Sequence, residues 1–586
     1  MHDAAAADLA PAERPAGARE LTVRSLITAM VVAAVIGGSY PYVVLKLGFG
    51  PNISVVSAFF GYLALGIAFR NFNRWENNIV QTAGTSAGQT AFLCVLMAAF
   101  DMLRMDPGAH FTFVLTPTMA FLWLTTAGIL GVLLSVPMRQ HFVVDEKLTF
   151  ADGVAAGETL IVLDSRGDES KSAARSMALG GVLSAVLFAI REDARLIGKA
   201  WYRIPELLPL SANGAKMNVG ISWSLLSLGS GMLVGFRVTV SMLIGCIVAW
   251  VLMPPWLLAS GWVPHMLRRE MLLWIMWPAT GVLVAGGLTA LVLRWKVLVK
   301  TFRNLTMASM DSGDFPIRWV IWGSLISAAA LVAVQVSLGM SPWLTIAAII
   351  LSLPLMLVGI RVLGETNWGP ISTLSNMMQG IFGVLAPGQL LPNIVSSGVT
   401  GSVASASEGL MQDYKTGYMI GSTPKYLTYA QLLAVPVGAA AVSFVYPLLR
   451  DSYGIGGDNG LQSPISQRFV GFGIILSKGL SALPHGAVAA LLVGAAIGVA
   501  LTLLESTFLR KWVPSPAGLG IGMLVPGSAV CTMFLGGLLQ EVWRIGSRRS
   551  QERYVVPLSS GFIAGEALIA TLIPILVALK ILHLQD

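Results

Sequence analysis

Charged residues are scarce in this sequence of 586 residues, and Asp, Glu, Lys and Arg together make up 12% of it. Ordinary soluble domains contain about 25%. Hydrophobic residues account for 55%, which excludes a chain that exposes most of its surface to water. Apolar stretches of about 20 residues, the length that a helix needs to cross about 30 Å of hydrocarbon, recur along nearly the whole chain. We therefore expect an all-α polytopic membrane protein with no room for a soluble domain.

Cysteine is also rare. Cys94, Cys246 and Cys531 stand alone in apolar surroundings, which indicates neither a disulfide framework nor a paired-cysteine metal site. The six histidines are scattered, so we predict no metal site and no cofactor. The sequence lacks a glycine-rich phosphate loop ending in Gly-Lys-Ser/Thr and lacks an H-E-x-x-H pair. ATP-driven pumping by this chain alone is not expected.

Basic residues outnumber acidic ones, with 38 Lys and Arg against 30 Asp and Glu. Many gather in short loops, as is typical of cytoplasmic loops between membrane helices. The membrane topology therefore explains the excess of Lys and Arg better than nucleic-acid binding does. We predict no nucleic-acid partner. The basic clusters include Arg70 with Arg74, Arg139 with Lys147, 294–303 and 544–553.

Residues 1–20 are rich in Ala with scattered charge, and we expect them to form a disordered cytoplasmic tail. The apolar segment that follows has no convincing small-residue cleavage site, which favours a retained helix over a signal peptide. We predict a multi-pass protein of the cell inner membrane with its N-terminus in the cytoplasm.

The apolar stretches predict about sixteen membrane helices. Candidates in the first half lie near 22–47, 52–70, 78–101, 112–137, 173–190, 218–234, 238–258 and 271–294. Candidates in the second half lie near 317–338, 342–362, 371–386, 394–411, 424–448, 485–505, 517–540 and 557–582. Residues 146–164 are too polar to face lipid, so we expect a re-entrant or broken helix there, and whether it crosses stays open.

The two halves, 21–300 and 301–586, share landmarks in the same order, which predicts an internal repeat. The matching segments are 48–66 with 367–388, 77–88 with 392–407, 117–137 with 424–447, and 150–160 with 514–524. If residues 146–164 do not cross, an odd number of crossings separates Pro51 from Pro370. The repeat would then be inverted, an arrangement typical of secondary transporters that bind substrate at the repeat interface.

Two polar runs, 77–90 and 393–417, are rich in small and hydrogen-bonding residues. Close helix packing alone could explain Gly84 and Gly88, which are four residues apart. It does not require so many amides and hydroxyls. If the helices break at their glycines, freed backbone groups and helix N-termini would suit a zwitterionic or anionic substrate. The candidate substrate-binding residues are Asn77, Asn78, Gln81, Thr82, Thr85, Ser86, Gln89, Asn393, Ser396, Ser397, Thr400, Ser402, Ser405 and Tyr414.

Acidic residues inside predicted spans are candidates for coupling transport to protons. A charge at the centre of a membrane helix costs about 2.5–3.5 kcal/mol on insertion scales, so retained charges face protein or water. The candidates are, in order, Glu408, Asp413, Glu365 and Glu158. A solvated helix-end pair with Lys415 is an equally good reading of Asp413.

For other groups near these spans, structural roles are the stronger interpretation. This applies to Glu505, Glu541 and Glu566, and Glu76 could cap the helix that follows it. Most Tyr and Trp residues beside the polar runs, including Trp368 and Tyr418, are better explained as interfacial anchors.

Several motifs resemble signatures of the oligopeptide transporter superfamily, in particular its yellow stripe-like branch and bacterial relatives. They are "ENNIVQT" (76–82), "KLTFADGVA" (147–155), "GLMQDYKTGYMIGSTPKY" (409–426), "GLSALPHG" (479–486) and "RKWVPSPAG" (510–518). The resemblance implies about sixteen helices and proton-coupled symport of oligopeptides or of metals chelated by amino-acid-like ligands. It does not decide between those substrates.

We therefore predict a secondary active symporter and no enzyme, with a small-molecule substrate, protons and the lipid bilayer as partners. A homo-oligomer is left open. The alternatives are a channel for small polar solutes and, less favoured, a polytopic membrane enzyme. Enzymes of that kind cluster acids or histidines on a loop at one face, whereas the polar groups here are amides and hydroxyls spread over two segments.

Overall fold

The computed structural model describes residues 18–578 apart from several short gaps. The gaps are 48–52, 70–71, 106–110, 165–167, 198–206, 210–211, 294–314, 367–368, 370, 457–459, 479–483 and 508–512. Most of the predicted tail, the turns at Pro51 and Pro370, Trp368, the basic loop at 294–303 and the boundary between the two halves lie outside the described residues.

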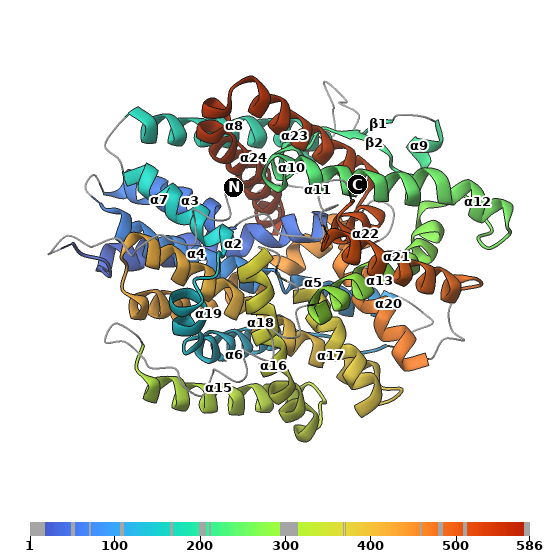
Figure 1. Cartoon of the computed structure of the whole chain (residues 1–586), viewed down its shortest axis with the longest axis horizontal. Helices are drawn as coiled ribbons and strands as arrows, with labels where there is room; N and C mark the ends of the chain where they lie inside the picture. The colour runs from blue at the N-terminus through green and yellow to red at the C-terminus, as the bar shows by residue number, and fades with distance from the viewer. Residues whose placement is uncertain are drawn as a thin grey trace.

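Helices make up nearly all of the described chain, which confirms the all-α polytopic class (Figure 1). The first half contains α2 (Val23–Leu47), α3 (Ile53–Ala68), α4 (Arg74–Ala91), α5 (Cys94–Met105), α6 (Pro117–Ser135), the π-helix η2 (Gln140–Asp145), α7 (Ala151–Asp164), α8 (Asp168–Ile197), α9 (Ala212–Lys216), α10 (Leu225–Val234), α11 (Phe236–Ile247), the π-helix η3 (Val248–Leu252), α12 (Met253–Ala259) and α13 (Arg268–Leu293).

The second half contains α15 (Ile317–Ser337), α16 (Pro342–Thr366), α17 (Ile371–Leu385), α18 (Leu390–Ile420), α19 (Pro424–Tyr453), α20 (Pro464–Lys478), α21 (Ala487–Glu505), α22 (Pro516–Leu524), α23 (Gly527–Gly546) and α24 (Arg548–Ala578). The described sheet is a small antiparallel pair of β1 (Leu207–Pro209) and β2 (Gly220–Ser222), in which Leu208 lies opposite Ile221.

Ten of the described helices are long and apolar enough to cross a membrane. They coincide with ten of the predicted spans. Local signals set several of their ends. Thr116 caps α6 by accepting the amide of Met119, and Pro117 occupies the first turn, where its missing N–H costs nothing. Thr423 and Pro424 begin α19 in the same way, although there the carboxylate of Glu20 accepts the amide of Thr423 at 2.9 Å.

The other predicted spans correspond to shorter, broken or more polar helices. The span predicted at 517–540 is divided into α22 and α23 around Pro526. The one predicted at 218–234 begins as strand β2 and continues as α10. Helix α20 was missed by the sequence reading, because Gln467 and Arg468 interrupt its apolar pattern.

The polar segment at 146–164 follows η2 directly and contains a loop and the 14-residue helix α7. At 1.5 Å per residue such a helix is about 21 Å long, too short to cross about 30 Å of hydrocarbon by itself. In the loop, Lys147 and Phe150 have positive φ angles of 48° and 42°, which are uncommon for residues other than glycine. The segment therefore has the form expected of a re-entrant element.

The expectation that the polar helices break at their glycines is wrong. Helix α4 continues through Gly84 and Gly88, and α18 continues through Gly398 and Gly401. These glycines allow close packing instead: a Cβ on Gly88 would lie 2.6 Å from a side-chain carbon of Ile53. The interruption of the first polar segment falls later, at the short turn that separates α4 from α5.

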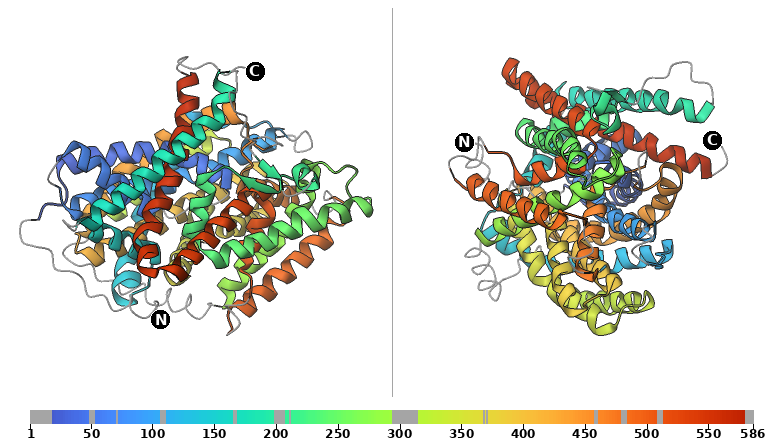
Figure 2. Two further views of the ribbon diagram at one scale, coloured as in Figure 1. Left: turned by 90° about the horizontal axis from the view of Figure 1, so that it is seen from above. Right: turned by 90° about the vertical axis from the view of Figure 1, so that its right-hand side faces the viewer.

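The two halves pack as equivalent pairs of helices. The contacts of α4 with α2, α3 and α19 are matched by contacts of α18 with α16, α17 and α6. The long pair α8 and α24 is matched by α21 and α13, and both pairs are visible side by side in Figure 2. Each half therefore completes its core with helices of the other half, and α18 passes near the middle of the molecule in Figure 1.

One predicted match between the halves does not follow this packing. Helix α7 contacts α3, α4 and α18, and α20 makes the equivalent contacts with α17, α18 and α5. Helix α22 contacts α11 and α13, as α10 contacts α23 and α24. The sequence supports this second pairing, because α10 and α22 carry the same Gly-Met-Leu-Val at 231–234 and 522–525. Residues 514–524 thus correspond to α10 and not to 150–160.

Candidate substrate site where α4 meets α18

The two predicted polar runs contact each other at the crossing of α4 and α18. The side-chain amide of Gln81 donates to Oδ1 of Asp413 at 2.7 Å. Further along, the hydroxyl of Ser405 donates to Oε1 of Gln89 at 2.7 Å. The early part of α4 thus lies against the late part of α18. The structure thus brings residues 77–90 into contact with the part of α18 from Ser405 onward.

Asp413 is the centre of this crossing, and its side chain is fully buried. Its Oδ1 accepts from Gln81, and its Oδ2 accepts from the amide of Gln431 in α19 at 2.6 Å. Gln81 also donates to Thr85 at 2.9 Å. Three helices therefore hold one carboxylate through neutral amides, and among the described residues Asp413 forms no ion pair.

The alternative of a solvated pair between Asp413 and Lys415 is wrong. Helix α18 continues to Ile420, and both side chains are buried, Lys415 to 3% exposure. Residues two apart on a helix point in different directions, so the two charges do not face each other. Lys415 instead lies against α7, where a Cβ on Gly153 would be 3.1 Å from its Cβ.

Glu408 lies further back on α18 and is also buried, with 2% of its surface exposed. Its Oε1 has no hydrogen-bond partner within the described part of the chain. The carboxylate fills a space left by glycines. A Cβ on Gly359 of α16 would lie 2.8 Å from Oε1, and a Cβ on Gly369 would collide with Oε2. Two glycines outside α18 thus make room for this one acidic group.

The other two predicted acids are placed differently. Glu158 is exposed on α7, away from the buried crossing. The backbone of Glu365 lies in the last turn of α16, and its side chain lies outside what the structure describes.

Most of the remaining predicted residues on α4 are buried and hydrogen-bonded around the crossing. Asn78 donates to Ser422 at 2.8 Å, Asn77 to the carbonyl of Ala58 at 3.2 Å, and Ser86 to the carbonyl of Gln431 at 3.4 Å. The Thr82 hydroxyl has no partner among the described residues. On α18, Tyr414 shares a 2.6 Å hydrogen bond with Thr428.

The first part of α18 belongs to a second polar cluster. Asn393 donates to the carbonyl of Gln379 in α17 at 2.7 Å, and the Gln379 amide donates back to Asn393 at 3.1 Å. Thr400 shares a 2.9 Å hydrogen bond with Ser352 of α16. Three other predicted hydroxyls form no hydrogen bond with α4 in the described structure: Ser396 and Ser397 bond to their own helix backbone, and Ser402 has no partner. The predicted residues therefore form two clusters and not one site.

Sequence reasoning missed Gln431 and Gln379, each of which holds a predicted residue in place. Gln431 is the single side-chain amide of α19, and Gln379 is one of two in α17, so amides in largely apolar stretches were the available signal. A buried amide that lies among apolar residues needs a partner.

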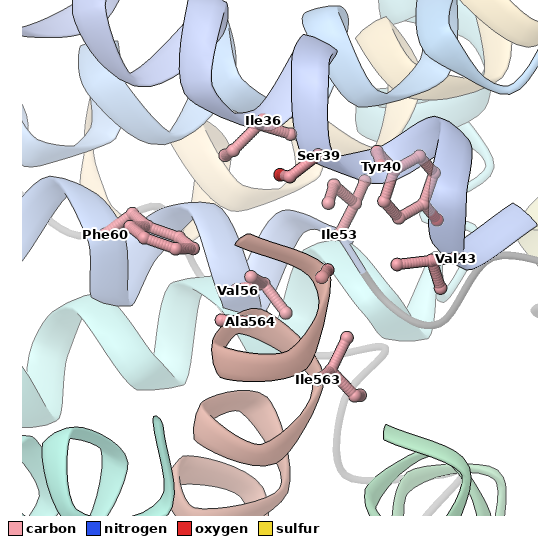
Figure 3. A pocket seen from close by; sticks show the side chains of 10 residues that line it. Ile36, Ser39, Tyr40, Val43, Ile53, Val56, Phe60, Ile563 and Ala564 are labelled. Atoms are coloured by element: carbon pink, nitrogen blue, oxygen red, sulfur yellow. The ribbon is translucent and has the colours of Figure 1, made fainter. Parts of the chain in front are cut away.

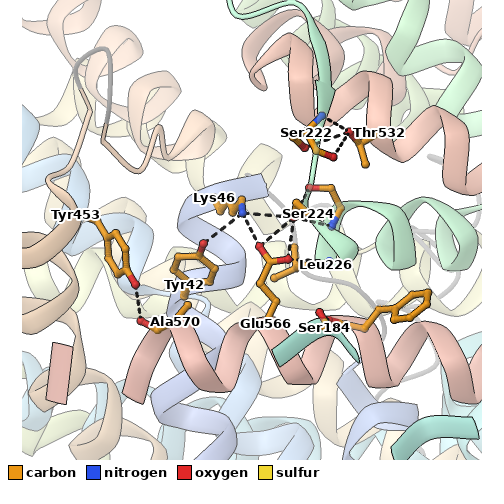
Figure 4. A network of polar contacts seen from close by, with 12 residues as sticks. Tyr42, Lys46, Ser184, Ser222, Ser224, Leu226, Tyr453, Thr532, Glu566 and Ala570 are labelled. Atoms are coloured by element: carbon orange, nitrogen blue, oxygen red, sulfur yellow. Dashed lines mark hydrogen bonds and ion pairs between the residues drawn. The ribbon is translucent and has the colours of Figure 1, made fainter. Parts of the chain in front are cut away.

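A separate buried network surrounds Glu566 of α24 (Figure 4). Its carboxylate pairs with Lys46 of α2 at 2.6 Å, accepts from the hydroxyl of Ser224 at 3.0 Å, and accepts from the amide of Leu226 at 3.1 Å. Ser224 and Leu226 stand at the N-terminus of α10, where a negative charge is favourable. Glu566 thus ties three helices together, as expected for a structural role.

Glu76 also has a structural environment. Its carboxylate accepts from Nε and Nη2 of Arg24 at 2.7 and 2.6 Å and from Thr22 at 2.6 Å. The cap of α4 is instead Asn73, whose side chain accepts the amide of Glu76.

A small pocket lies between α2, α3 and α24 (Figure 3). Its lining is mainly apolar, with Ile36, Val56 and Ile563 among the contributors and Ser39 and Tyr40 as the polar members. It contains none of the predicted substrate-binding residues. It is therefore separate from the crossing of α4 and α18.

Neither catalytic nor metal-binding geometry stands out at the crossing. Residues 84–88 spell Gly-Thr-Ser-Ala-Gly, the letters of a hydrolase nucleophile elbow. That elbow is a sharp turn between a strand and a helix, whereas Ser86 lies inside α4 and bonds to a backbone carbonyl. Among the described residues, no group of three His, Cys, Asp or Glu side chains is placed to hold a metal ion.

Comparison with known proteins gives a consistent answer over nearly the full length. The sequence matches the family described as "OPT oligopeptide transporter protein" over residues 20–577. It is 22% identical to a "Putative oligopeptide transporter" of Saccharomyces cerevisiae, covering 96% of this chain and 97% of that one. It is 24% identical to a "Putative oligopeptide transporter" of Haemophilus influenzae, covering 92% and 93%.

A metal-nicotianamine transporter of Arabidopsis thaliana is 22% identical, covering 94% of this chain and 93% of that one. Proteins named for two substrate classes are thus similar to this chain to the same degree. All of them are named as transporters, which agrees with a transporter and not an enzyme. The chain belongs to the oligopeptide transporter family.

Proposed function

We propose that this protein is a secondary active symporter that imports oligopeptides or amino-acid-like metal chelates across the cell inner membrane, driven by protons, through alternating access. Its relatives include proteins named for each of these substrates, which supports both classes equally. We further propose that 21–300 and 301–586 are inverted repeat halves, that the N-terminus is cytoplasmic, and that α4 and α18 line the substrate path.

The observation that carries this proposal is the pair of buried carboxylates on α18. Among the described residues, Glu408 has an oxygen without a partner, and Asp413 is held by neutral groups, with the amides of Gln81 and Gln431 donating to its two oxygens. Burying a carboxylate in its charged form without a counter-ion is costly, so a proton or another cation has to accompany it. A group of this kind beside the substrate path is the simplest device for coupling to protons.

The energy available is sufficient. One charge that crosses a membrane potential of 100 mV gains about 2.3 kcal/mol, which supports a roughly fiftyfold gradient of a neutral substrate. No nucleotide-binding motif is present in the sequence, so an ion gradient is the remaining source.

The test is uptake into proteoliposomes under an imposed pH gradient, with and without sodium, using labelled di- to tetrapeptides and metal-nicotianamine chelates. Wild-type protein should accumulate at least one of these substrates when the pH gradient is imposed. Glu408→Gln should lose uphill accumulation and keep exchange of substrate across the membrane. Glu158→Gln, which changes an exposed acid in the same manner, is the matched control and should accumulate substrate normally.

Three results would contradict the proposal. Accumulation that requires sodium and ignores pH would indicate sodium coupling through the hydroxyl-rich part of α18. A fully active Glu408→Gln variant would remove Glu408 from the coupling mechanism. Pore-like conductance without saturation or counterflow would favour the channel alternative.

A further inference from the structure

Arg468 of α20 is a buried cation that has no counter-ion among the described residues. Only 5% of its surface is exposed, and its Nε and Nη2 have no hydrogen-bond partner within the described part of the chain. Its guanidinium carbon lies 6.0 Å from the ring centroid of Phe469. By comparison, buried Arg361 of α16 pairs with Glu146. An unpaired buried charge is costly, and a protein keeps one where it serves a function.

The two unpaired nitrogens of Arg468 form one edge of the guanidinium. This edge presents two parallel N–H groups that match the two oxygens of a carboxylate. The same structure shows this pairing at Arg24, where Nε donates to Oε1 of Glu76 at 2.7 Å and Nη2 donates to Oε2 at 2.6 Å. The open edge of Arg468 is therefore shaped for a carboxylate.

Arg468 also lies beside the second polar cluster. The carbonyl of the next residue, Phe469, accepts from the Gln379 amide at 3.1 Å, and Gln379 exchanges hydrogen bonds with Asn393. Helix α20 packs directly on α18 as well, because a Cβ on Gly473 would lie 3.0 Å from Ile394. Helix α20 thus adjoins the first part of α18, and Arg468 directly precedes the residue that contacts Gln379.

Unpaired polar atoms continue along the neighbouring helix. Asn376 of α17 is 1% exposed, and neither its Oδ1 nor its Nδ2 has a partner among the described residues. It lies one turn before Gln379, whose Oε1 is also unpaired. Residues three apart share a helix face, so these amides face the same side of α17. Buried polar groups are normally paired, so these unpaired atoms on α17 and on α20, which pack against each other, indicate a ligand site.

We propose that the Nε and Nη2 edge of Arg468 binds a carboxylate of the transported substrate. This carboxylate is either the C-terminus of a peptide or an acid group of the chelating ligand. The inference rests on the proposed function, and it adds a specific anchor at the end of the substrate path opposite to Asp413. Asp413 is placed at the crossing with α4, whereas Arg468 directly precedes Phe469, whose carbonyl contacts the pair of Gln379 and Asn393 near the start of α18.

The experiment compares trialanine with its C-terminal amide, and nickel-nicotianamine with its methyl ester. Uptake by the full-length protein in proteoliposomes gives KM for each probe. For whichever acid is transported, Arg468→Gln should raise KM about tenfold or more, since hydrogen bonds to charged groups are lost. It should leave KM unchanged for the amide or ester, in which the free carboxylate is blocked. Arg468→Lys, which keeps the charge without the two-pronged edge, should fall between these values.

Arg361→Gln is the matched control, because Arg361 is a buried arginine that already has a carboxylate partner. It should not change the ratio of KM values for acid and neutral probe. Retained transport of the neutral analogue shows that Arg468→Gln is folded. An unchanged ratio in folded Arg468→Gln would overturn the proposal, as would equal KM values for both probes in wild type.

A failure of the proposed symport function can be distinguished from a failure of the carboxylate site at Arg468. Thermal stabilisation of the purified protein by each probe measures binding without transport. If wild type conducts ions or couples to sodium, the symport proposal fails, and acid-selective stabilisation that Arg468→Gln abolishes still supports the carboxylate site. If inorganic phosphate or chloride stabilises wild type as strongly as the acids do, the site is a general anion site and the proposal is overturned.

Discussion

Replacing Glu566 with Gln should destabilise the protein by about 2–3 kcal/mol, because the substitution leaves Lys46 without its carboxylate. The removal of one partner of a buried ion pair costs about 3–5 kcal/mol. The Lys46 side chain is 22% exposed, so water compensates for part of the loss and the value falls at or below the lower end. Gln also keeps one acceptor oxygen for Ser224 or for the amide of Leu226, which now bond to the carboxylate at 3.0 and 3.1 Å.

The assay is equilibrium or thermal unfolding of the detergent-solubilised protein, arranged as a double-mutant cycle. The variants are Glu566→Gln, Lys46→Met and the combination of both. If the ion pair carries the stability, the double variant should be less destabilised than the sum of the single ones. Glu541→Gln is the control, because its ion pair with Arg544 lies on the surface and should leave stability unchanged. Equal stability of Glu566→Gln and wild type, or strict additivity in the cycle, would refute this reasoning.

Two further predictions concern packing and topology. Gly131→Val should prevent stable folding, because a Cβ at Gly131 would lie 2.6 Å from the carbonyl oxygen of Val403, a backbone atom that cannot move aside. Gly380→Ala, where a Cβ meets nothing within 4 Å, should fold normally, and yields of monodisperse protein after solubilisation compare the two. Single cysteines at positions 51 and 370 should react with an impermeant maleimide from opposite sides of the membrane. Labelling of both from one side would rule out the inverted repeat.

The features predictable from the sequence were those set by local residues. The Thr-Pro pairs at 116–117 and 423–424 begin helices because the proline ring geometry, and at Thr116 the side-chain cap, act within one turn. Long apolar runs gave ten spans for the same reason. The polar runs were also visible, since amides and hydroxyls are unusual in apolar surroundings.

The pairing of these residues was not predictable, because it depends on contacts between distant helices. Nothing near Gln81 in the sequence indicates that it bonds to Asp413. The sequence analysis did not single out Gln431 of α19, which bonds to Asp413, or Arg468 of α20, which is buried with unpaired nitrogens among the described residues. The glycines of α4 and α18 were misread as breaks, because a glycine that permits close packing and one that ends a helix look alike in a sequence.

The interleaving of the two halves has a consequence for how the chain is made. Asp413, the partner of Gln81, is synthesised 332 residues after Gln81. At about 5–20 residues per second, the ribosome needs roughly 17–66 s to synthesise that interval. During this time Asn78, Gln81 and Ser86 lack the later residues to which they donate in the finished protein, and in lipid each unpaired group costs several kcal/mol. We therefore expect α4 to stay in the insertion machinery or at the membrane surface until α18 emerges. A ribosome that stalls before α18 would leave a chain that cellular quality control can recognise by this one polar helix.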